Sequence, residues 1–426
     1  MPTWDVVIVG AGAAGLCCAQ ALVDKNLRVC VLEASDRPGG RLKTDMVDGF
    51  RLDHGFQVLL TAYPAAQQTL RYESLKLGRF QPGAKVWWNG RFHTVSDPLR
   101  RPAEAFSTLQ APIGSLMDKL RIAQLRYEST QGDLSELFER PSKPTLAWLQ
   151  QYGFSDAMIQ RFFYPFLGGI FLDPTLQTSS RMLQFVWRMF TEGMAALPAE
   201  GIESIARQWA QGLPNDWLYC NTPAVAVEEG AVVTADGHRW EGQTIVLATD
   251  LSTARHLLGK NQRRTEDADC YPVSCLYFEA PSAPFLEPLL VLNGERRVAE
   301  TDINNLCVPT NVCASYGPGD GRALVSVSVL SSQAPDVTPT LRRWFGNQVV
   351  DRWRLLKTYT IANALPQKST QLTDTAWYRE LPHPRTVILC GDYTEMPSLQ
   401  GAIVSGQKAA AEALRRLQSD AVSAWR

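Results

Sequence analysis

The stretch Val6-Val7-Ile8-Val9-Gly10-Ala11-Gly12-Ala13-Ala14-Gly15 decides the fold of this chain. Its apolar first half predicts a short buried strand, and residues 16–25 after it predict a helix. A second apolar run at residues 28–32 predicts a neighbouring strand, which ends at Glu33. This order of strand, glycine-rich turn, helix, strand and acidic residue is typical of a Rossmann-type unit that binds a dinucleotide. In such a unit, Glu33 can accept hydrogen bonds from the ribose hydroxyls of the dinucleotide.

The residues of the turn have separate physical tasks in such a unit. Gly10 permits the tight turn, Gly12 lets the backbone approach a pyrophosphate, and Gly15 lets helix and strand pack closely. Ala13 and Ala14 offer free N–H groups to the phosphates at the positive end of the helix dipole. A glycine-rich turn of another α/β fold is the alternative, but strand, helix and acid all agree here.

Composition and charge exclude several classes of protein. The 426 residues allow two or three structural units with a large core. Lys and Arg number 42 against 43 for Asp and Glu, without a basic stripe, so we expect no nucleic-acid partner. Nine cysteines without CxxC pairs predict neither a metal site nor a disulfide framework. The longest strongly apolar stretch, residues 162–172, is too short to span a bilayer, and the chain begins with the predicted strand. We therefore expect a cytoplasmic protein, soluble or peripheral to a membrane.

The cofactor-binding domain is predicted to be discontinuous. Short apolar runs at residues 224–227 and 231–234 predict a hairpin, and those at 244–249, 323–330 and 386–390 predict strands. Helices are expected at residues 339–353 and 398–417. The predicted fold class is α/β, with a Rossmann-type cofactor-binding domain of residues 1–62, 213–250 and 385–426. It is interrupted by a mixed α+β substrate domain of residues 63–212, a largely helical insertion, and residues 251–384.

A second glycine-rich loop follows the acidic residue. In Ala34-Ser35-Asp36-Arg37-Pro38-Gly39-Gly40-Arg41, adjacent glycines with flanking arginines suit a loop that runs against phosphates; the alternative is a solvated turn. With Glu33, this loop resembles the E-A-x-x-x-x-G-G-R stretch of the flavin-containing amine oxidoreductase superfamily. The resemblance implies that the dinucleotide is FAD and adds five residues to its site: Ala34, Arg37, Gly39, Gly40 and Arg41.

Two further segments carry the same resemblance. Residues 193–198, Gly-Met-Ala-Ala-Leu-Pro, are similar to the family's turn before its second cofactor segment, and Ala224 stands where the family backbone meets the adenine. Gly391-Asp392-Tyr393-Thr394 and residues 398–406 are similar to the last cofactor segment. The resemblance implies that Asp392 binds the ribityl–pyrophosphate region of FAD. It also implies that Gly401 and Ala402 belong to a helix whose N-terminus points at the isoalloxazine ring.

Within the superfamily, the chain most resembles the plant-type carotenoid (phytoene) desaturases. Residues 55–64, Gly-Phe-Gln-Val-Leu-Leu-Thr-Ala-Tyr-Pro, are similar to their segment beside the flavin. Amine oxidases often place an aromatic residue shortly before the helical Gly-Ala, whereas this chain has Ser398, Leu399 and Gln400. No cysteine stands where some relatives attach flavin covalently, and Cys390 lies in a predicted strand, so we expect noncovalent FAD.

The resemblance implies transfer of a hydride from a small-molecule substrate to flavin N5. The main hypothesis is a desaturase-like dehydrogenase of an apolar, isoprenoid-like substrate, with quinone or oxygen as electron acceptor. An amine oxidase that releases hydrogen peroxide and a non-catalytic flavin-binding protein are the alternatives. No catalytic residue is identified. His54 is a candidate base and Lys357 a candidate to hold a water near N5, but a packed histidine and an exposed lysine are the simpler explanations.

Two aromatic segments leave alternatives open. Residues 85–95 predict a β-hairpin around Asn89-Gly90, in which Trp87 and Trp88 either meet a membrane interface or pack on the helical insertion. Residues 162–171 either line a cavity for an apolar substrate or form ordinary core. Peripheral membrane contact is thus a prediction tied to the two tryptophans.

Overall fold

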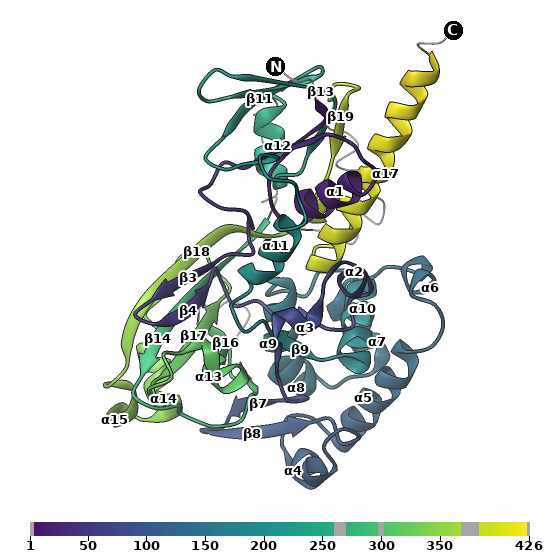
Figure 1. The fold of residues 1–426 in the computed structure, drawn as a ribbon. Coiled ribbons are helices and arrows are strands. Elements are labelled where there is room, and N and C mark those ends of the chain that lie inside the picture. Colours follow the sequence, from purple (N-terminus) through teal and green to yellow (C-terminus); the bar gives the residue numbers. More distant parts are fainter. Residues whose placement is uncertain (1–3, 260–269, 297–301, 368–382, 424–426) are drawn as a thin grey trace.

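The cofactor-side sheet occupies the upper part of the molecule in Figure 1, a computed structural model that describes residues 4–259, 270–296, 302–367 and 383–423. Its strands are β1 (Trp4–Val9), β2 (Val29–Leu32), β10 (Leu218–Tyr219), β13 (Arg239–Leu247) and β19 (Val387–Leu389). They lie in the order β10-β2-β1-β13-β19, and each neighbouring pair is parallel. Valine-rich runs suit such strands because helices bury both faces of a parallel sheet.

Helices cover both faces of this sheet (Figure 1). On one face lie α1 (Ala13–Val23) and α17 (Leu399–Ser423), and on the other lies α12 (Leu251–Leu257). The two helices on the first face approach very closely. A Cβ on Gly406 would lie 2.4 Å from the carbonyl oxygen of Ala14, so only glycine fits at that crossing. Segments from opposite ends of the chain are thereby packed into one unit.

A second sheet takes strands from both insertions. Its order is β18-β14-β17-β16-β15-β7-β8, antiparallel except between β15 and β7. The strands are β7 (Gly83–Trp88), β8 (Arg91–Ser96), β14 (Cys270–Ala280), β15 (Leu290–Asn293), β16 (Ile303–Cys307), β17 (Ala323–Val329) and β18 (Arg354–Pro366). Smaller pairings join β3 (Thr44–Val47) to β4 (Phe50–Asp53), and β9 (Ala195–Leu197) to β5 (Leu59–Leu60) and β6 (Gly78–Arg79).

The first insertion is mainly helical and lies at the lower right of Figure 1. Its longer helices, α5 (Leu116–Ser129) and α10 (Ser180–Glu192), are in contact with each other. Its other helices are short: α2 (Pro64–Thr69), α3 (Tyr72–Leu75), η1 (Pro102–Glu104), α4 (Ala105–Gln110), α6 (Leu134–Glu139), α7 (Thr145–Tyr152), α8 (Asp156–Met158), η2 (Ile159–Phe163), α9 (Tyr164–Phe171) and α11 (Glu203–Ala210). Later in the chain come α13 (Pro309–Val312), η3 (Ala314–Tyr316), α14 (Thr338–Phe345), α15 (Asn347–Val350) and η4 (Asp392–Thr394). Among the described residues, no helix has the length and apolar character needed to cross a membrane.

The predicted elements are mostly confirmed. The hairpin of β11 (Ala224–Glu228) and β12 (Ala231–Thr234) extends the upper sheet along β13. Asn89 and Gly90 have positive φ angles of 51° and 74°, which a tight hairpin turn requires. The helix predicted at residues 339–353 is wrong, because Gly346 at φ 88° and ψ 149° leaves the helical region and separates α14 from α15. The expected domain boundaries stay a prediction.

Candidate cofactor site and substrate cavity

One cavity of about 1130 Å³ begins at the Rossmann turn and runs into the helical insertion. Its cofactor end collects residues from the start, middle and end of the chain. The predicted site residues that line it are Gly10, Gly12, Ala13, Ala14, Glu33, Ala34, Gly39, Gly40, Arg41, Ala224, Gly391, Asp392 and Ala402. The structure therefore brings together most of the residues that the sequence assigned to the dinucleotide.

The Rossmann turn has the geometry that a phosphate-binding loop needs. Gly10 has a φ of 103°, and a Cβ there would lie 2.8 Å from the carbonyl oxygen of Ala248. A Cβ on Gly12 would meet nothing within 4 Å, so this backbone faces open space in the cavity. Gly12 is also the N-cap of α1, and no side chain caps that helix end. An anion placed there would meet free N–H groups and the positive end of the helix dipole.

Glu33 is held in place at the end of β2. Its Oε2 accepts a hydrogen bond of 2.8 Å from the backbone N–H of Ala11, and its Oε1 accepts from the N–H and hydroxyl of Ser35 at 3.0 and 2.5 Å. A carboxylate has about four acceptor positions, so room is left for a further donor. The side chain is therefore oriented and able to accept from a ribose hydroxyl, and that role stays a prediction.

An ion pair joins the second glycine-rich loop to the C-terminal segment. Arg41 Nη2 donates to Asp392 Oδ1 at 2.7 Å, and its Nη1 donates to the carbonyl oxygen of Ala364 at 3.0 Å. Both charged residues line the cavity. The N–H of Gly391 donates to the Ser405 hydroxyl at 2.9 Å, which fixes the turn before Asp392 to α17. Residues 351 positions apart thus form one wall of the cofactor end.

Three predicted site residues do not line the cavity. Gly15 and Gly401 are packing residues: a Cβ on Gly15 would lie 2.0 Å from Gly10 O, and one on Gly401 would lie 1.8 Å from Met396 O. Arg37, the third of them, is paired with acidic residues outside the cavity, and its place in the cofactor site stays a prediction. Its Nε donates to Glu203 at 3.0 Å and its Nη2 donates to Asp45 at 2.7 Å. The guanidinium of Arg37 therefore joins the second glycine-rich loop to α11 and β3.

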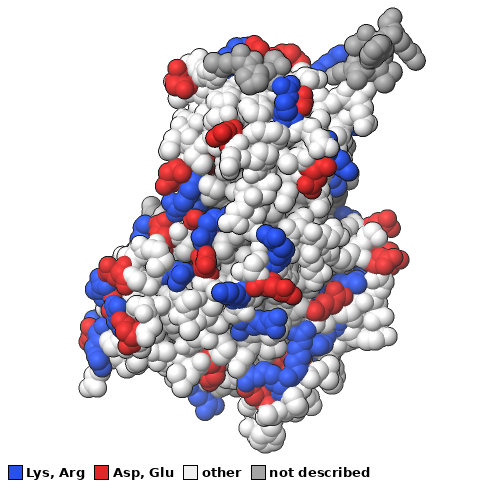
Figure 2. Space-filling model, viewed as in Figure 1, with Lys and Arg blue, Asp and Glu red and all other residues white. Residues whose placement is uncertain are grey.

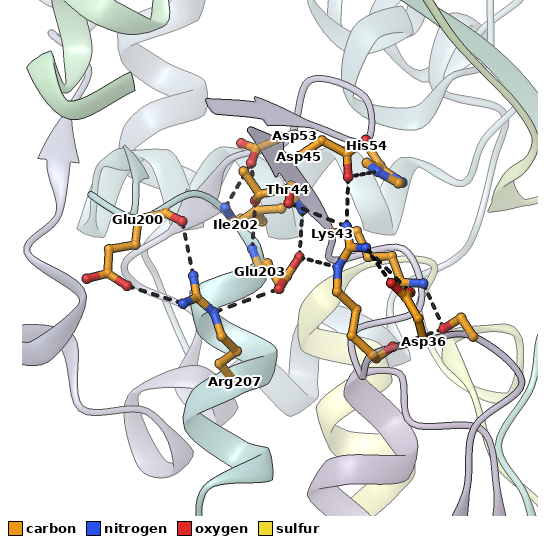
Figure 3. A network of polar contacts seen from close by, with 12 residues as sticks. Asp36, Lys43, Thr44, Asp45, Asp53, His54, Glu200, Ile202, Glu203 and Arg207 are labelled. Carbon is orange, nitrogen blue, oxygen red and sulfur yellow. Dashed lines mark hydrogen bonds and ion pairs between the residues drawn. The ribbon is translucent and has the colours of Figure 1, made fainter. Parts of the chain in front are cut away.

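Asp45 is the centre of a polar network that includes both candidate catalytic residues, of which Figure 3 shows His54. Lys357 Nζ and the Tyr359 hydroxyl each donate to its Oδ2 at 2.7 Å, and His54 Nε2 lies 3.1 Å from its Oδ1. Partial burial would raise the pKa of Asp45, but hydrogen bonds from Lys357, Tyr359, His54 and Arg37 hold it well below its ordinary value. Lys357 lies outside the cavity lining, and its suggested role near flavin N5 stays an untested prediction.

His54 does line the cavity, and its ring is held by two neighbouring side chains. The imidazole packs on Tyr359, with ring centroids 4.6 Å apart, and points its Nε2 to Asp45. This arrangement makes His54 a packed histidine that shapes the wall. Its role as a base stays an untested prediction.

A second buried carboxylate, Asp53, ties β4 to α11 (Figure 3). Its Oδ1 accepts from the Thr44 hydroxyl at 2.6 Å and from the N–H of Ile202 at 3.0 Å, and its Oδ2 accepts from Tyr316 at 2.7 Å. Burial raises the pKa of Asp53 to about 6, and these hydrogen bonds oppose the shift. Sequence reasoning missed this residue, because its partners come from distant segments.

Beyond the cofactor end, the cavity walls are aromatic and aliphatic. Phe162 and Phe166 stack with centroids 5.2 Å apart, and Phe166 also contacts Phe190 at 5.4 Å. The segment at residues 162–171 therefore lines the cavity in part and is core in part, because Phe163 is fully buried, while its use for an apolar substrate stays a prediction. The sequence analysis missed the facing wall on α10, which consists of Met182, Val186, Trp187 and Phe190. Their helical spacing was the available signal.

The tryptophan pair packs against neighbouring side chains. Trp87 is buried between Phe92 and Trp344, with ring centroids 4.9 and 6.0 Å away. Trp88 is half-buried, with the Arg161 guanidinium carbon 4.0 Å from its ring centroid. Trp87 therefore packs against α14 through Trp344, and contact of the pair with a membrane interface stays a prediction.

Comparisons with known proteins show the family of this chain. Residues 13–414 match the family described as flavin containing amine oxidoreductase. The chain belongs to this family. This flavin oxidoreductase is 29% identical to chloroplastic protoporphyrinogen oxidase 1 of Spinacia oleracea over 204 residues. The matched region covers 44% of this chain and 33% of that relative. Over 180 residues, 38% of this chain and 35% of the relative, it is 31% identical to phytoene dehydrogenase of Streptomyces griseus. The chain spans about a third of the length of these curated relatives.

Solved structures show the same fold. A triple mutant of putrescine oxidase superimposes with a TM-score of 0.71 over 97% of this flavin oxidoreductase and 100% of that chain, at 17% identity. Family membership implies a flavin cofactor, and the residues present fit one. The open space at Gly12, the uncapped α1 and the oriented Glu33 carboxylate suit the pyrophosphate and ribose of a dinucleotide.

Proposed function

We propose that this flavin oxidoreductase binds FAD noncovalently and removes a hydride from an apolar, isoprenoid-like substrate, with quinone or oxygen as the final electron acceptor. Flavin supplies the two-electron chemistry when bound. The chain's own residues bind the substrate, orient it and exclude water. None of the nine cysteines lines the cavity, which supports a cofactor without a thioether link.

The observation that carries the proposal is the placement of carboxylates in the cavity. Glu33, Asp250 and Asp392 line its cofactor end, beside the Rossmann turn and the ends of β13 and β19. Among the described residues, the remaining acidic lining residue is Asp97, which forms ion pairs with Arg100 and Arg126. The aromatic part between these places has no described carboxylate to receive an ammonium group. A buried ammonium without a partner is costly, so an apolar substrate fits better.

Relatives lend support to the proposal and also to a rival function. The chain is similar to a phytoene dehydrogenase, a name that denotes oxidation of an apolar polyene. It is also 27% identical to putrescine oxidase of Kocuria rosea over 51% of its length. Amine oxidation with release of hydrogen peroxide is therefore the rival function. The positions before the helical Gly-Ala, Ser398 to Gln400, carry no aromatic residue, which supports the desaturase-like reaction over its rival.

The proposal is tested by anaerobic reduction of the bound flavin. Purified holoprotein is mixed with isoprenoid hydrocarbons in detergent and, separately, with putrescine and primary amines. The proposal predicts loss of oxidised-flavin absorbance with an isoprenoid, slowed in Phe166→Ala and unchanged in Phe138→Ala, since Phe138 lies outside the cavity lining. Bleaching by amines alone would establish the rival function. Lack of bleaching by any compound, with full FAD content, would favour a non-catalytic flavin-binding protein.

A further inference from the structure

Exposed apolar side chains gather in one part of this molecule. Leu99 is 78% exposed and Phe106 is 70% exposed, and four residues that follow are also exposed. We call this set the mouth patch: Leu99, Phe106, Leu109, Leu116, Met117 and Leu120. The other exposed large apolar residues outside this part of the chain are scattered singly, which is ordinary for a folded protein.

The mouth patch is a built surface. Leu116, Met117 and Leu120 share one face of α5, whose start is fixed by a capping box between Ser115 and Asp118. Lys119 Nζ donates to the carbonyl oxygen of Ala111 at 3.0 Å, and also to that of Leu109. These contacts hold the end of α4 against α5, so the apolar side chains are presented together.

The mouth patch borders the cavity. Leu99, Leu109, Leu116 and Leu120 line the same cavity as Gly12 at the Rossmann turn. Each of the four is also exposed to solvent, so they form the rim of an opening. An apolar molecule that enters here would pass from the rim along the aromatic walls to the cofactor end. Without an apolar partner, such a rim is unfavourable, because exposure of apolar surface to water raises the free energy of the protein.

The charge around the mouth patch is positive. Residues 97–127 contain five basic and three acidic residues, and the acidic Asp118 is fully buried. Figure 2 shows an uncharged knob at the lower tip of the molecule, where Figure 1 places α4, with Lys and Arg gathered just above it. Apolar side chains that protrude below a basic belt match the two layers of an anionic lipid surface: acyl chains first, then phosphate headgroups.

We propose that the mouth patch docks this flavin oxidoreductase on an anionic lipid bilayer. The protruding knob suits insertion into lipid better than packing against a second copy, which needs a broad complementary surface. The bilayer also dissolves the apolar substrate, so the docked opening faces the substrate's own phase. That last step rests on the proposed function; docking itself does not.

Vesicle flotation with the holoprotein tests the proposal. The chain is mixed with vesicles of phosphatidylcholine alone or of phosphatidylcholine with phosphatidylglycerol, at low and high salt. We expect flotation with the anionic vesicles that salt weakens. The double variant Phe106→Ser/Met117→Ser alters two exposed side chains outside the cavity lining and should weaken binding by at least about tenfold. The matched control Met46→Ser/Leu286→Ser alters two equally exposed apolar residues elsewhere and should bind as the wild type does.

The outcomes separate docking from catalysis. Wild-type protein that stays unbound, or a double variant that floats as well as the wild type, would overturn the docking proposal. So would a wild-type dimer that the double variant converts to monomer, because the patch would then bind a second copy. Flavin content and melting temperature of both variants confirm folding. Reduction of the flavin by isoprenoids in detergent is measured separately. A failure of the proposed function is therefore distinguishable from a failure of vesicle binding.

Discussion

A substitution at Gly12 should weaken cofactor binding without preventing folding. In Gly12→Leu, the new Cβ meets nothing within 4 Å, and the native φ of −78° is ordinary for any residue. The only cost to the apoprotein is a poorer N-cap for α1, about 1 kcal/mol. The leucine side chain would instead occupy the space above the first turn of α1. A pyrophosphate excluded from there would lose about two charge-assisted hydrogen bonds, each worth about 1.5–3 kcal/mol. FAD affinity should therefore fall at least about a hundredfold.

The matched variant is Gly15→Ala, which adds a Cβ 2.0 Å from Gly10 O and should disrupt folding rather than empty a folded site. Apoprotein of each variant is titrated with FAD by quenching of flavin fluorescence, and unfolding is followed by circular dichroism. We expect Gly12→Leu to melt near the wild-type apoprotein and to bind FAD weakly. Wild-type FAD affinity in Gly12→Leu would refute the placement of the pyrophosphate at this turn.

Three further substitutions test the framework of the site. Gly401→Ala adds a Cβ 1.8 Å from Met396 O and should lower the free energy of unfolding by about 2 kcal/mol or more, measured by urea denaturation. Burial raises the pKa of Asp53 to about 6, so the native state binds an extra proton between about pH 4 and 6. Wild-type stability relative to Asp53→Asn should therefore fall by about 2 kcal/mol as the pH rises through that window; equal pH slopes would contradict this. Hydrogen bonds lower the pKa of Asp45 despite partial burial, so its contribution is present above about pH 4 and lost as the pH falls. Asp45→Asn should destabilise by about 1–2 kcal/mol at neutral pH, and a difference that persisted unchanged in acid would refute the pairing.

The cofactor end could be predicted because its signals are local. The glycine spacing from Gly10 to Gly15 is typical of one kind of phosphate-binding turn, and the apolar runs around it predict buried strands. The Arg41–Asp392 ion pair was not visible as a contact. Both residues were nevertheless assigned to the site from motifs at opposite ends of the chain, and the sheet that brings those ends together follows from the same motifs.

The structure differs from the simplest expectation mainly where distant segments set the environment of a residue. Lys357 and Arg37 carry charges that the sequence offered to the cofactor, but Asp45 lies between them and takes both. Trp87 is covered by Trp344, which stands on a helix in the other insertion. The helix predicted at residues 339–353 ignored Gly346, although glycine is a common helix breaker. Tertiary contacts, absent from any local pattern, set the surroundings of Lys357, Arg37 and Trp87, whereas Gly346 was a local signal.

The proposed function requires that an apolar molecule reduces the flavin of this chain. The most direct measurement is anaerobic mixing of the holoprotein with the organic and aqueous halves of a partitioned metabolite extract, followed by flavin absorbance and mass spectrometry of the oxidised product. We predict that the organic half bleaches the flavin and yields a product with one more double bond. Bleaching by the aqueous half alone, with an amine as the consumed compound, would contradict the account.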